Sequence, residues 1–411
     1  MIDLLELSIQ FDSSLVDTID ERHAFVGVDL KEMEIPLGAK DVHFRDDGST
    51  AASALYHPYE SLPTSFTGLA LKVHFDGYFF PHVTIKGSPA KILQGHNVFG
   101  TDDLELCVTE MLYWLQEKYP ELYGMLAINT AEVRKMDVTY SSIVGSPKLV
   151  RLAIDYMSRI SNGQTKPTKS KKFETTMYWG GAESRLIRLK CYSKFDEYMA
   201  QLDNFKKEAQ KGLDPRAIKI MNVMSDERLI DRARTSLRWE ATFMKRWLER
   251  NDIPVNVWDL INYQKANPDF LQRIWSKGFE KIFEAMKGLD MTLVNEDRVL
   301  DKLKAEFGKP LASGRMSYRK AINLYSFYTQ LKVIGVSEMK AQRLYSPSQL
   351  NRLFADLITA GFTKSFLQNI HANSDSKTIS FVNLINIDFS KQLPDWYVEP
   401  LSTPQKLRLV A

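Results

Sequence analysis

One segment of the chain carries a row of cations interrupted by a tyrosine. In RLIRLKCYSKFDE (185–197), polar residues occupy every second position: Arg188, Lys190, Tyr192 and Lys194. Successive side chains of a β-strand point to opposite faces, so these four are predicted to share one outward face. Cations bind phosphate, and a tyrosine hydroxyl beside a bound phosphate is a candidate nucleophile that bonds covalently to phosphorus. The pattern indicates phosphodiester chemistry, in which Lys194 would lower the pKa of the phenol or neutralise the transition state.

Two carboxylates fall on the polar faces of other predicted strands. Asp137 lies in VRKMDVTYSS (133–142), and Glu240 lies in TSLRWEATFM (235–244). If these strands pair with the tyrosine strand in one antiparallel sheet, both carboxylates join the tyrosine on one face. Paired carboxylates suit Mg²⁺ or Mn²⁺, which would polarise a scissile phosphate and stabilise the developing charge.

Each of these residues also has an ordinary structural interpretation. Tyrosine is common in half-buried strands. An aspartate such as Asp137 is usually solvated or salt-bridged, and Glu240 can simply pair with Arg238 or with a neighbouring strand. The hypothesis therefore depends on these residues sharing one face of one sheet.

The elements that would position this face follow from apolar spacing. LALKVHF (69–75) and FPHVTIKG (80–87) flank the turn Asp76-Gly77 and predict a hairpin, which adds His82 to the polar face. Helical spacing over 103–119 and 146–160 predicts helices that cover the apolar face.

After about residue 250, the spacing of apolar residues has the period of a helix in every patterned segment. We predict an α+β fold, with an N-terminal antiparallel sheet backed by helices in residues 1–250 and a mainly helical domain in residues 251–411.

The composition limits the class of protein. The 411 residues are 44% hydrophobic and 26% charged, which is typical of a soluble globular protein. Two cysteines give no disulfide framework and no cysteine-based metal site, and a reducing cytoplasm fits. The N-terminus lacks the basic region of a signal peptide, and no apolar run is long enough to span a membrane, so no membrane association is expected.

The formal net charge is only +3, so a site for a polyanion must come from local clusters of cations. Such contacts bind phosphate without reading much sequence. The first predicted cluster lies on the polar sheet face: Arg188, Lys190 and Arg238. The second is the polar loop 161–172, with Lys166, Lys169, Lys171 and Lys172.

Longer stretches resemble the replication-associated gene II proteins of filamentous bacteriophages, nearly from end to end. The most distinctive are HPYESLPTSFTG (57–68), GSPAKILQGHNVFGTDDLELC (87–107), ISNGQTK (160–166) and INIDFSKQLPDWYVEP (385–400). The order of the Asp137, Tyr192 and Glu240 strands is also similar to that of plasmid rolling-circle initiators.

The resemblance implies an origin-specific endonuclease and strand-transfer enzyme. Tyr192 would take the 5′-phosphate of the nicked viral strand, and Asp137 and Glu240 would be metal ligands. Such nucleases carry a His-hydrophobic-His motif, but here His82 is followed by Thr84. The third ligand is therefore left open among three residues: His82, His96 and Glu174.

The implied partners are the double-stranded replicative form at its origin, the displaced single strand, and a host helicase and polymerase in the bacterial cytoplasm. No G-x-x-x-x-G-K-[ST] loop is present, so unwinding is assigned to the host helicase. Self-association on the DNA stays open. The family also makes a shorter product by internal initiation, and Met291 is the matching position, so residues 291–411 are expected to be separately stable. This segment either binds DNA or a partner, or is a helical domain that only packs on the nuclease.

Two alternatives to the tyrosine nickase remain. A non-catalytic origin-binding or single-strand-binding protein would use the same basic sheet face. A metal-dependent nuclease that uses water would need Tyr192 only to stack on a base.

Overall fold

The computed structural model divides into two compact units, which are described separately. Unit 1 contains Met1–Pro147, Gly181–Gly278 and Ile387–Ala411, and unit 2 contains Lys148–Gly180 and Phe279–Asn386. The structure describes residues 1–19, 23–31, 40–44, 50–54, 59, 62, 66–157, 168–169, 175–181, 184–211, 215–287, 296–311, 314–362, 364–371 and 387–405.

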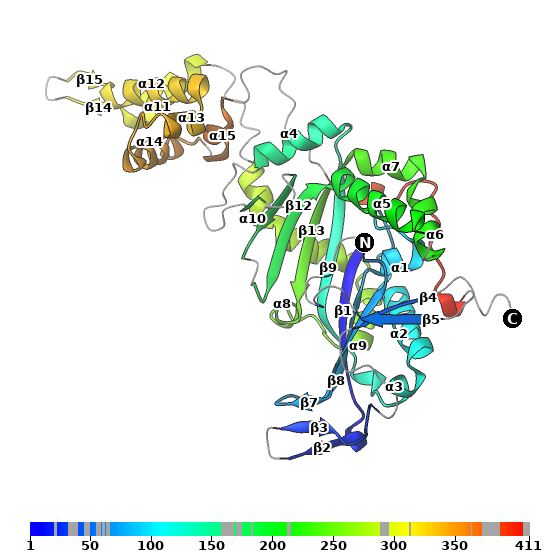
Figure 1. Cartoon of the computed structure of the whole chain (residues 1–411). Coiled ribbons are helices and arrows are strands. Elements are labelled where there is room, and N and C mark those ends of the chain that lie inside the picture. The colour runs from blue at the N-terminus through cyan, green and yellow to red at the C-terminus, as the bar shows by residue number, and fades with distance from the viewer. Residues whose placement is uncertain are drawn as a thin grey trace. The chain divides into compact units, whose positions relative to one another are not determined.

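An antiparallel sheet forms the centre of unit 1 (Figure 1), as predicted. Its strand order is β12-β13-β9-β1-β8-β6-β4-β5. The strands are β1 (Ile2–Gln10), β4 (Lys40–Phe44), β5 (Thr50–Ala54), β6 (Leu69–His74), β8 (His82–Gly87), β9 (Glu132–Ile143), β12 (Ile187–Ser193) and β13 (Ser236–Met244).

The predicted pairing of 69–75 with 80–87 is confirmed by the β6–β8 register. Asp76-Gly77 is not a plain turn between them. It forms β7 (Asp76–Gly77) in a separate small sheet with β2 (Val16–Thr18) and β3 (Ala24–Val26).

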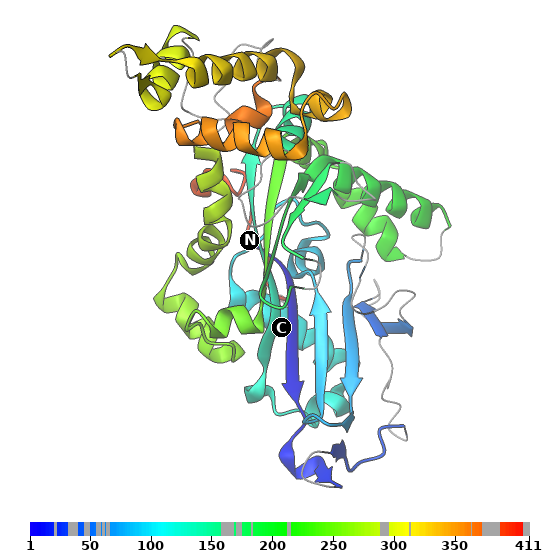
Figure 2. The same cartoon turned by 90° about the vertical axis from the view of Figure 1, so that its left-hand side faces the viewer.

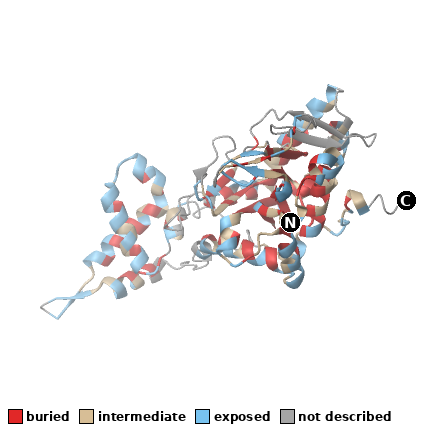
Figure 3. Cartoon of the chain, turned by 90° about the horizontal axis from the view of Figure 1, so that it is seen from below, coloured by how far each residue is buried: buried red, intermediate tan, exposed pale blue. Residues whose placement is uncertain are grey.

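The apolar face of the sheet is the core of unit 1 (Figure 3). Leu5, Ile85 and Trp239 are fully buried, as the alternation predicts. α10 (Phe270–Lys287) packs on this face, and the indole N–H of Trp275 donates to the Trp239 carbonyl at 3.2 Å. Gly278 permits the close approach, because a Cβ there would lie 2.9 Å from Ile187.

Helices lie on both sides of the sheet of unit 1 (Figure 2). α5 and α6 lie on one side, and α9 and the start of α10 lie on the other. The helices of this unit are α1 (Pro89–Gln94), α2 (Leu104–Lys118), α3 (Pro120–Gly124), α5 (Lys194–Gln210), α6 (Pro215–Met224), α7 (Glu227–Arg234), α8 (Lys245–Glu249), α9 (Val257–Ala266) and the first half of α10.

The C-terminal segment 387–405 belongs to unit 1 although it follows unit 2 in the chain. The Gln392 side chain acts as a strand partner for Ser141 of β9, accepting from its backbone N–H at 2.7 Å and donating to its carbonyl at 3.0 Å. Further along, the Thr403 backbone N–H donates to Glu110 of α2 at 2.6 Å. The two bonds of Gln392 satisfy backbone groups of β9 beyond the end of β1.

Unit 2 is mainly helical, as predicted for the C-terminal region. Its core includes Leu303, Leu324, Phe327 and Leu357. Its elements are most of α4 (Pro147–Met157), the pair β10 (Thr168–Lys169) and β11 (Thr176–Trp179), the second half of α10, α11 (Glu296–Phe307), the pair β14 (Lys309–Pro310) and β15 (Met316–Ser317), α12 (Arg319–Ile334), α13 (Val336–Ala341), α14 (Pro347–Thr359) and α15 (Lys364–Asn369).

The two units do not share the bounds of the predicted domains. The division expected near residue 250 falls inside unit 1, and the unit boundary lies within α10. Met291, the expected start of a shorter product, lies outside the described residues. Within the described ranges, no helix is both long and apolar enough to cross a membrane.

Candidate functional site

The strand register brings the predicted tyrosine and carboxylates onto one face of the sheet. Tyr192 pairs with Arg238, and Lys190 pairs with Glu240. On the other side of β13, Glu240 pairs with Thr139, and Asp137 stands one diagonal step away, opposite Thr242. Residues directly opposite each other in adjacent strands share a face, so three neighbouring strands contribute to the same polar surface.

The tyrosine hydroxyl contacts one of the two carboxylates. Tyr192 Oη donates to Glu240 Oε2 at 3.3 Å. Lys190 Nζ lies 2.7 Å from the other oxygen, Glu240 Oε1, and 5.1 Å from the centre of the Tyr192 ring. A phenol, a carboxylate and an ammonium group therefore form one connected cluster.

This face is buried, which differs from the outward, solvent-facing surface expected from the sequence. Tyr192 is 6% exposed, Glu240 3% and Arg238 0%. The loop after α1 contributes to the cover, since Asn97 accepts a hydrogen bond from Arg238 through its carbonyl. Alternation assigns residues to a face but does not say what covers it.

A buried charge network supports the cluster from one side. Arg238 Nη2 lies 3.4 Å from Asp3 Oδ2, and the Asn97 amide donates to Asp3 Oδ1 at 2.8 Å. Lys194 Nζ donates to Asn97 Oδ1 at 2.8 Å and to the Glu197 carboxylate. Asp3, Asn97 and Glu197 were not predicted from the sequence as residues of the site. Asp3 could have been noticed in the sequence because it is an acid within the apolar run MIDLL.

Lys194 does not continue the strand row that was predicted for it. β12 ends at Ser193, whose hydroxyl accepts from the Asp196 backbone N–H as the N-cap of α5. Lys194 is therefore the first residue of a helix. Burial lowers the pKa of its ammonium to about 8, and it contacts Asn97 rather than the Tyr192 hydroxyl.

Burial also controls the acidity of the cluster. It raises the pKa of Tyr192 well above the ordinary value, against the prediction that a neighbouring lysine lowers it. Burial raises the pKa of Glu240 to about 7, with Lys190 opposing the rise and the Asp137 charge adding to it. Near neutral pH the Glu240 carboxylate is therefore suited to accept a proton from the hydroxyl that it contacts.

Beside the two carboxylates, Asp137 and Glu240, lie buried oxygen atoms that could bind a divalent cation. Asp137 Oδ1 and Thr139 Oγ1 are buried and have no hydrogen-bond partner among the described residues. Within that same part of the chain, no three histidine, cysteine, aspartate or glutamate side chains are grouped as metal ligands. Mg²⁺ is commonly held by one or two carboxylates with phosphate oxygens and water, and this pair can supply such a site.

Of the three candidates for a third ligand, the two histidines are not grouped with the carboxylates among the described residues. Asp137 pairs with Leu4 of β1, whereas His82 pairs with Gln10, six residues further along. At about 3.3 Å per residue, His82 is about 20 Å away, stacked on His74. His96 is buried close to Lys194, and burial lowers its pKa to about 3. Glu174 lies outside the described residues.

The predicted DNA-binding cations are only partly described. Arg188 lies on β12 two residues before Lys190, on the same face, and its Nε donates to the Ser184 carbonyl at 3.3 Å. Lys169 lies in β10, although nothing is described of its side chain. The remaining loop lysines lie outside the described residues: Lys166, Lys171 and Lys172.

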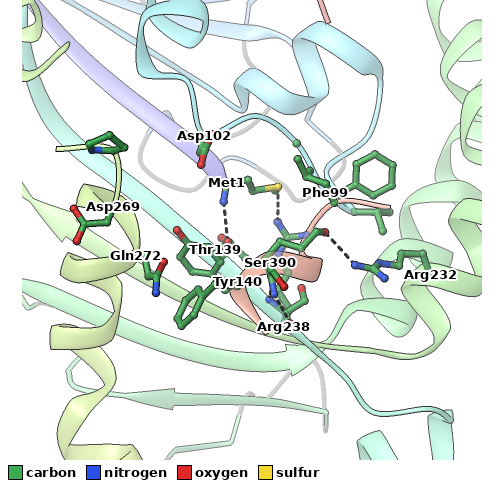
Figure 4. Close-up of a pocket in the computed structure, with 17 residues that line it drawn as sticks. Met1, Phe99, Asp102, Thr139, Tyr140, Arg232, Arg238, Asp269, Gln272 and Ser390 are labelled. Atoms are coloured by element: carbon green, nitrogen blue, oxygen red, sulfur yellow. Dashed lines mark hydrogen bonds between the residues drawn. The ribbon is translucent and has the colours of Figure 1, made fainter. Parts of the chain in front are cut away.

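A cavity of about 180 Å³ adjoins the Arg238 side of the cluster (Figure 4). Thr139 and Tyr140 of β9 line it together with Ser390 of the C-terminal segment. Arg232 holds this segment by donating to the carbonyls of Lys391 at 2.6 Å and Gln392 at 3.0 Å. The C-terminal segment is therefore part of the wall around the buried site.

The fold and the site define a class of protein, in which one antiparallel sheet presents a tyrosine, two carboxylates and several cations on a single face. The chain belongs to the family of the phage replication-associated proteins encoded by gene II. The profile that describes the N-terminal part of this replication-associated protein matches residues 1–266, and the profile for its C-terminal part matches residues 311–403.

Full-length relatives agree with this assignment. The chain is 35% identical to the replication-associated protein of Salmonella phage IKe, over 100% of this chain and 99% of the relative. It is 33% identical to the proteins of the same name in Enterobacteria phages fd and M13, in each case over 98% of this chain and 99% of the relative. No solved structure matches the chain.

Proposed function

We propose that this replication-associated protein initiates and ends rolling-circle replication by nicking and rejoining the viral strand through a 5′-phosphotyrosine intermediate. The observation that carries the proposal is the contact between Tyr192 Oη and Glu240 Oε2, on the face that also holds Asp137. The family name places the protein in phage DNA replication, and a nucleophile beside a proton acceptor supplies the chemistry.

In the nicking step, Lys190 and Arg188 hold the DNA backbone by charge-assisted hydrogen bonds to phosphate. Tyr192 gives its proton to Glu240 as Oη attacks phosphorus. The new O–P bond forms as the bond from phosphorus to the 3′ oxygen breaks, and that oxygen leaves as a 3′-hydroxyl after taking up a proton. The bond energy is conserved in the phosphotyrosine, and the free 3′-hydroxyl can prime synthesis.

Asp137 and Glu240 are the residues that would hold Mg²⁺ or Mn²⁺. Such an ion, when bound, polarises the scissile phosphate and stabilises the negative charge that develops on it. Lys194 acts as a positioning residue, because its ammonium holds Asn97, which in turn binds Asp3 and Arg238.

Rejoining is the reverse reaction. Cleavage of the regenerated origin releases the 3′-hydroxyl of the completed strand. That hydroxyl loses its proton to water as it attacks the phosphotyrosine, the bond from phosphorus to the tyrosine oxygen breaks as the phosphodiester bond reforms, and the tyrosine oxygen recovers a proton from Glu240. The partners of this cycle are the double-stranded replicative form at its origin, the displaced single strand, and a host helicase and polymerase in the bacterial cytoplasm.

A non-catalytic origin-binding or single-strand-binding role is the second candidate, and one observation favours it. Tyr192 is 6% exposed, and burial raises its pKa, so the phenol is shielded and hard to ionise. Nicking therefore requires that bound DNA reach the buried sheet face that carries Tyr192. DNA binding without cleavage would require only the cations at the surface.

The test is an adduct assay on supercoiled DNA that carries the origin. The protein is incubated with DNA and Mg²⁺, denatured, and examined for a covalent bond to a 5′ end. Nicking through tyrosine predicts an adduct that disappears in Tyr192→Phe and when EDTA removes the metal. Tyr198→Phe is the matched control, since that buried hydroxyl donates to the Met224 carbonyl at 2.7 Å, away from Glu240.

Two results would contradict the proposal. No cleavage at all would indicate a binding protein. A free 5′-phosphate with little loss in Tyr192→Phe would indicate a nuclease that uses water. The double variant Asp137→Ala/Glu240→Ala should abolish cleavage in either enzymatic case while DNA binding stays measurable.

A further inference from the structure

A second cavity in unit 1 lies where β12 begins, away from α5. It measures about 390 Å³ and is lined mainly by cations: Arg134, Arg185, Arg188, Lys245 and Arg246. Of these cations, only Arg188 was predicted from the sequence to bind DNA. Arg134 lies near the start of β9 and Arg188 near the start of β12. Arg185 lies just before β12, and Arg246 lies in α8, which follows β13 directly. The antiparallel pairing of β12, β13 and β9 brings these segments to one end of the sheet.

Glu249 also lines this cavity, so its carboxylate offsets only part of the charge of the five cations. Lys245 is neutralised, with Nζ 2.5 Å from Glu132 and 3.8 Å from Glu249. In the described part of the chain, no carboxylate forms an ion pair with any of the four arginines. Guanidinium groups that outnumber the nearby carboxylates form an anion site, and their fork geometry suits the oxygens of phosphate.

The strand register connects this cavity to the tyrosine. Arg188 is two residues from Lys190 and four from Tyr192 on the same face of β12. At about 3.3 Å per residue, the cavity begins about 13 Å from the tyrosine. A strand whose scissile phosphate lies at Tyr192 would pass Lys190 and Arg188 and present a flanking phosphate to the cavity.

We propose that this arginine cavity binds the backbone of single-stranded DNA next to the scissile phosphate. The proposal rests on the proposed function, because that function places the strand at Tyr192. A single strand is the occupant because the tyrosine face is closed, with Tyr192 only 6% exposed. A duplex is wider, and it would have to unpair before its backbone reached that residue.

The test measures DNA binding by the full chain in EDTA, so that no cleavage is needed. Fluorescence anisotropy with labelled oligo(dT) is recorded over about 50 to 200 mM NaCl. In Arg134→Ser/Arg185→Ser/Arg246→Ser we expect the affinity to fall about tenfold or more. The slope of log affinity against log salt should decrease by about 2, since each lost phosphate contact on a single strand removes about 0.7. The charge-preserving Arg→Lys triple variant should retain most of the salt slope.

The matched control removes the same charge elsewhere in unit 1. Lys206→Ser/Lys207→Ser/Lys219→Ser changes exposed residues of α5 and α6. It should lower the affinity less than about threefold. Equal losses in the two triple variants would show that only net charge matters, and an unchanged affinity in the arginine variant would also overturn the proposal.

Two further outcomes are informative. A loss confined to a labelled duplex of matched length would overturn the choice of single-stranded DNA. The proposed function fails separately, through an adduct that persists in Tyr192→Phe, and that result would leave the binding measurement intact.

Discussion

The hydroxyl of Tyr192 and the carboxylate of Glu240 are hydrogen-bonded across two adjacent strands, with Oη 3.3 Å from Oε2. The two residues are diagonal neighbours, because Tyr192 pairs with Arg238 and Glu240 pairs with Lys190. The geometry follows from the strand register and needs no movement of a loop. The proton acceptor is therefore beside the candidate nucleophile before any DNA is bound.

Replacing the acceptor tests this relationship. Glu240→Gln keeps the size of the side chain but cannot accept the proton or carry charge, so we expect nicking to slow by about 10² to 10⁴-fold. The rate of conversion of supercoiled to open-circular DNA measures the loss. Binding to DNA in EDTA should be retained. Glu306→Gln, at an exposed position of α11, is the control, and full nicking activity in Glu240→Gln would exclude the role of this carboxylate.

The buried pair of Arg238 and Asp3 should contribute strongly to stability. Arg238→Met leaves Asp3 as a buried charge without its ion-pair partner, so the free energy of unfolding should fall by about 3 to 5 kcal/mol in urea titrations. Adding Asp3→Asn should recover part of that loss, since the orphaned charge is removed. A double variant no more stable than the single one would argue against the pairing.

An exposed ion pair provides the comparison. Arg234 Nη1 lies 2.7 Å from Asp231 at the protein surface, with side chains 46% and 68% exposed. Arg234→Met should cost less than about 1 kcal/mol, because solvent screens such pairs.

His96 should make the protein sensitive to acid. Burial lowers its pKa from 6.5 to about 3, so between these values the unfolded chain binds a proton that the folded chain does not. The stability from neutral His96 is fully present above pH 6.5 and is lost as the pH falls toward 3. In this window His96→Gln should reduce the slope of unfolding free energy against pH by up to about 1.4 kcal/mol per pH unit. Urea titrations at a series of pH values measure this slope, and a slope that is unchanged in His96→Gln would contradict the prediction.

The C-terminal segment should protect the edge of β9. Gln392→Ala removes both hydrogen bonds to the Ser141 backbone. The free energy that protects the Ser141 amide from exchange should therefore fall by about 1 to 3 kcal/mol, and its exchange rate should rise accordingly. Hydrogen exchange read by mass spectrometry measures it. Gln342→Ala, which removes an exposed bond to Glu338 within unit 2, should not affect that peptide. Unchanged exchange in Gln392→Ala would mean that other contacts hold the segment.

Local patterning predicted much of the site, but not its surroundings. The alternation around Asp137, Tyr192 and Glu240 placed them correctly on one face, because a strand repeats every two residues wherever it lies in the fold. The same reasoning extended the strand to Lys194, where Ser193 instead caps a helix. An N-cap serine and a strand serine look alike in a short alternating run.

The sequence by itself determined the antiparallel sheet, the mainly helical C-terminal region and the shared face of the tyrosine and carboxylates, since these follow from periodicities read within a few residues. Only the tertiary structure decided that this face is buried, that Asp3 and Asn97 hold Arg238, and that residues 387–405 return to β9. Burial, and the pKa values that depend on it, are set by contacts between segments far apart in the chain, and a local sequence pattern does not predict which segments come into contact.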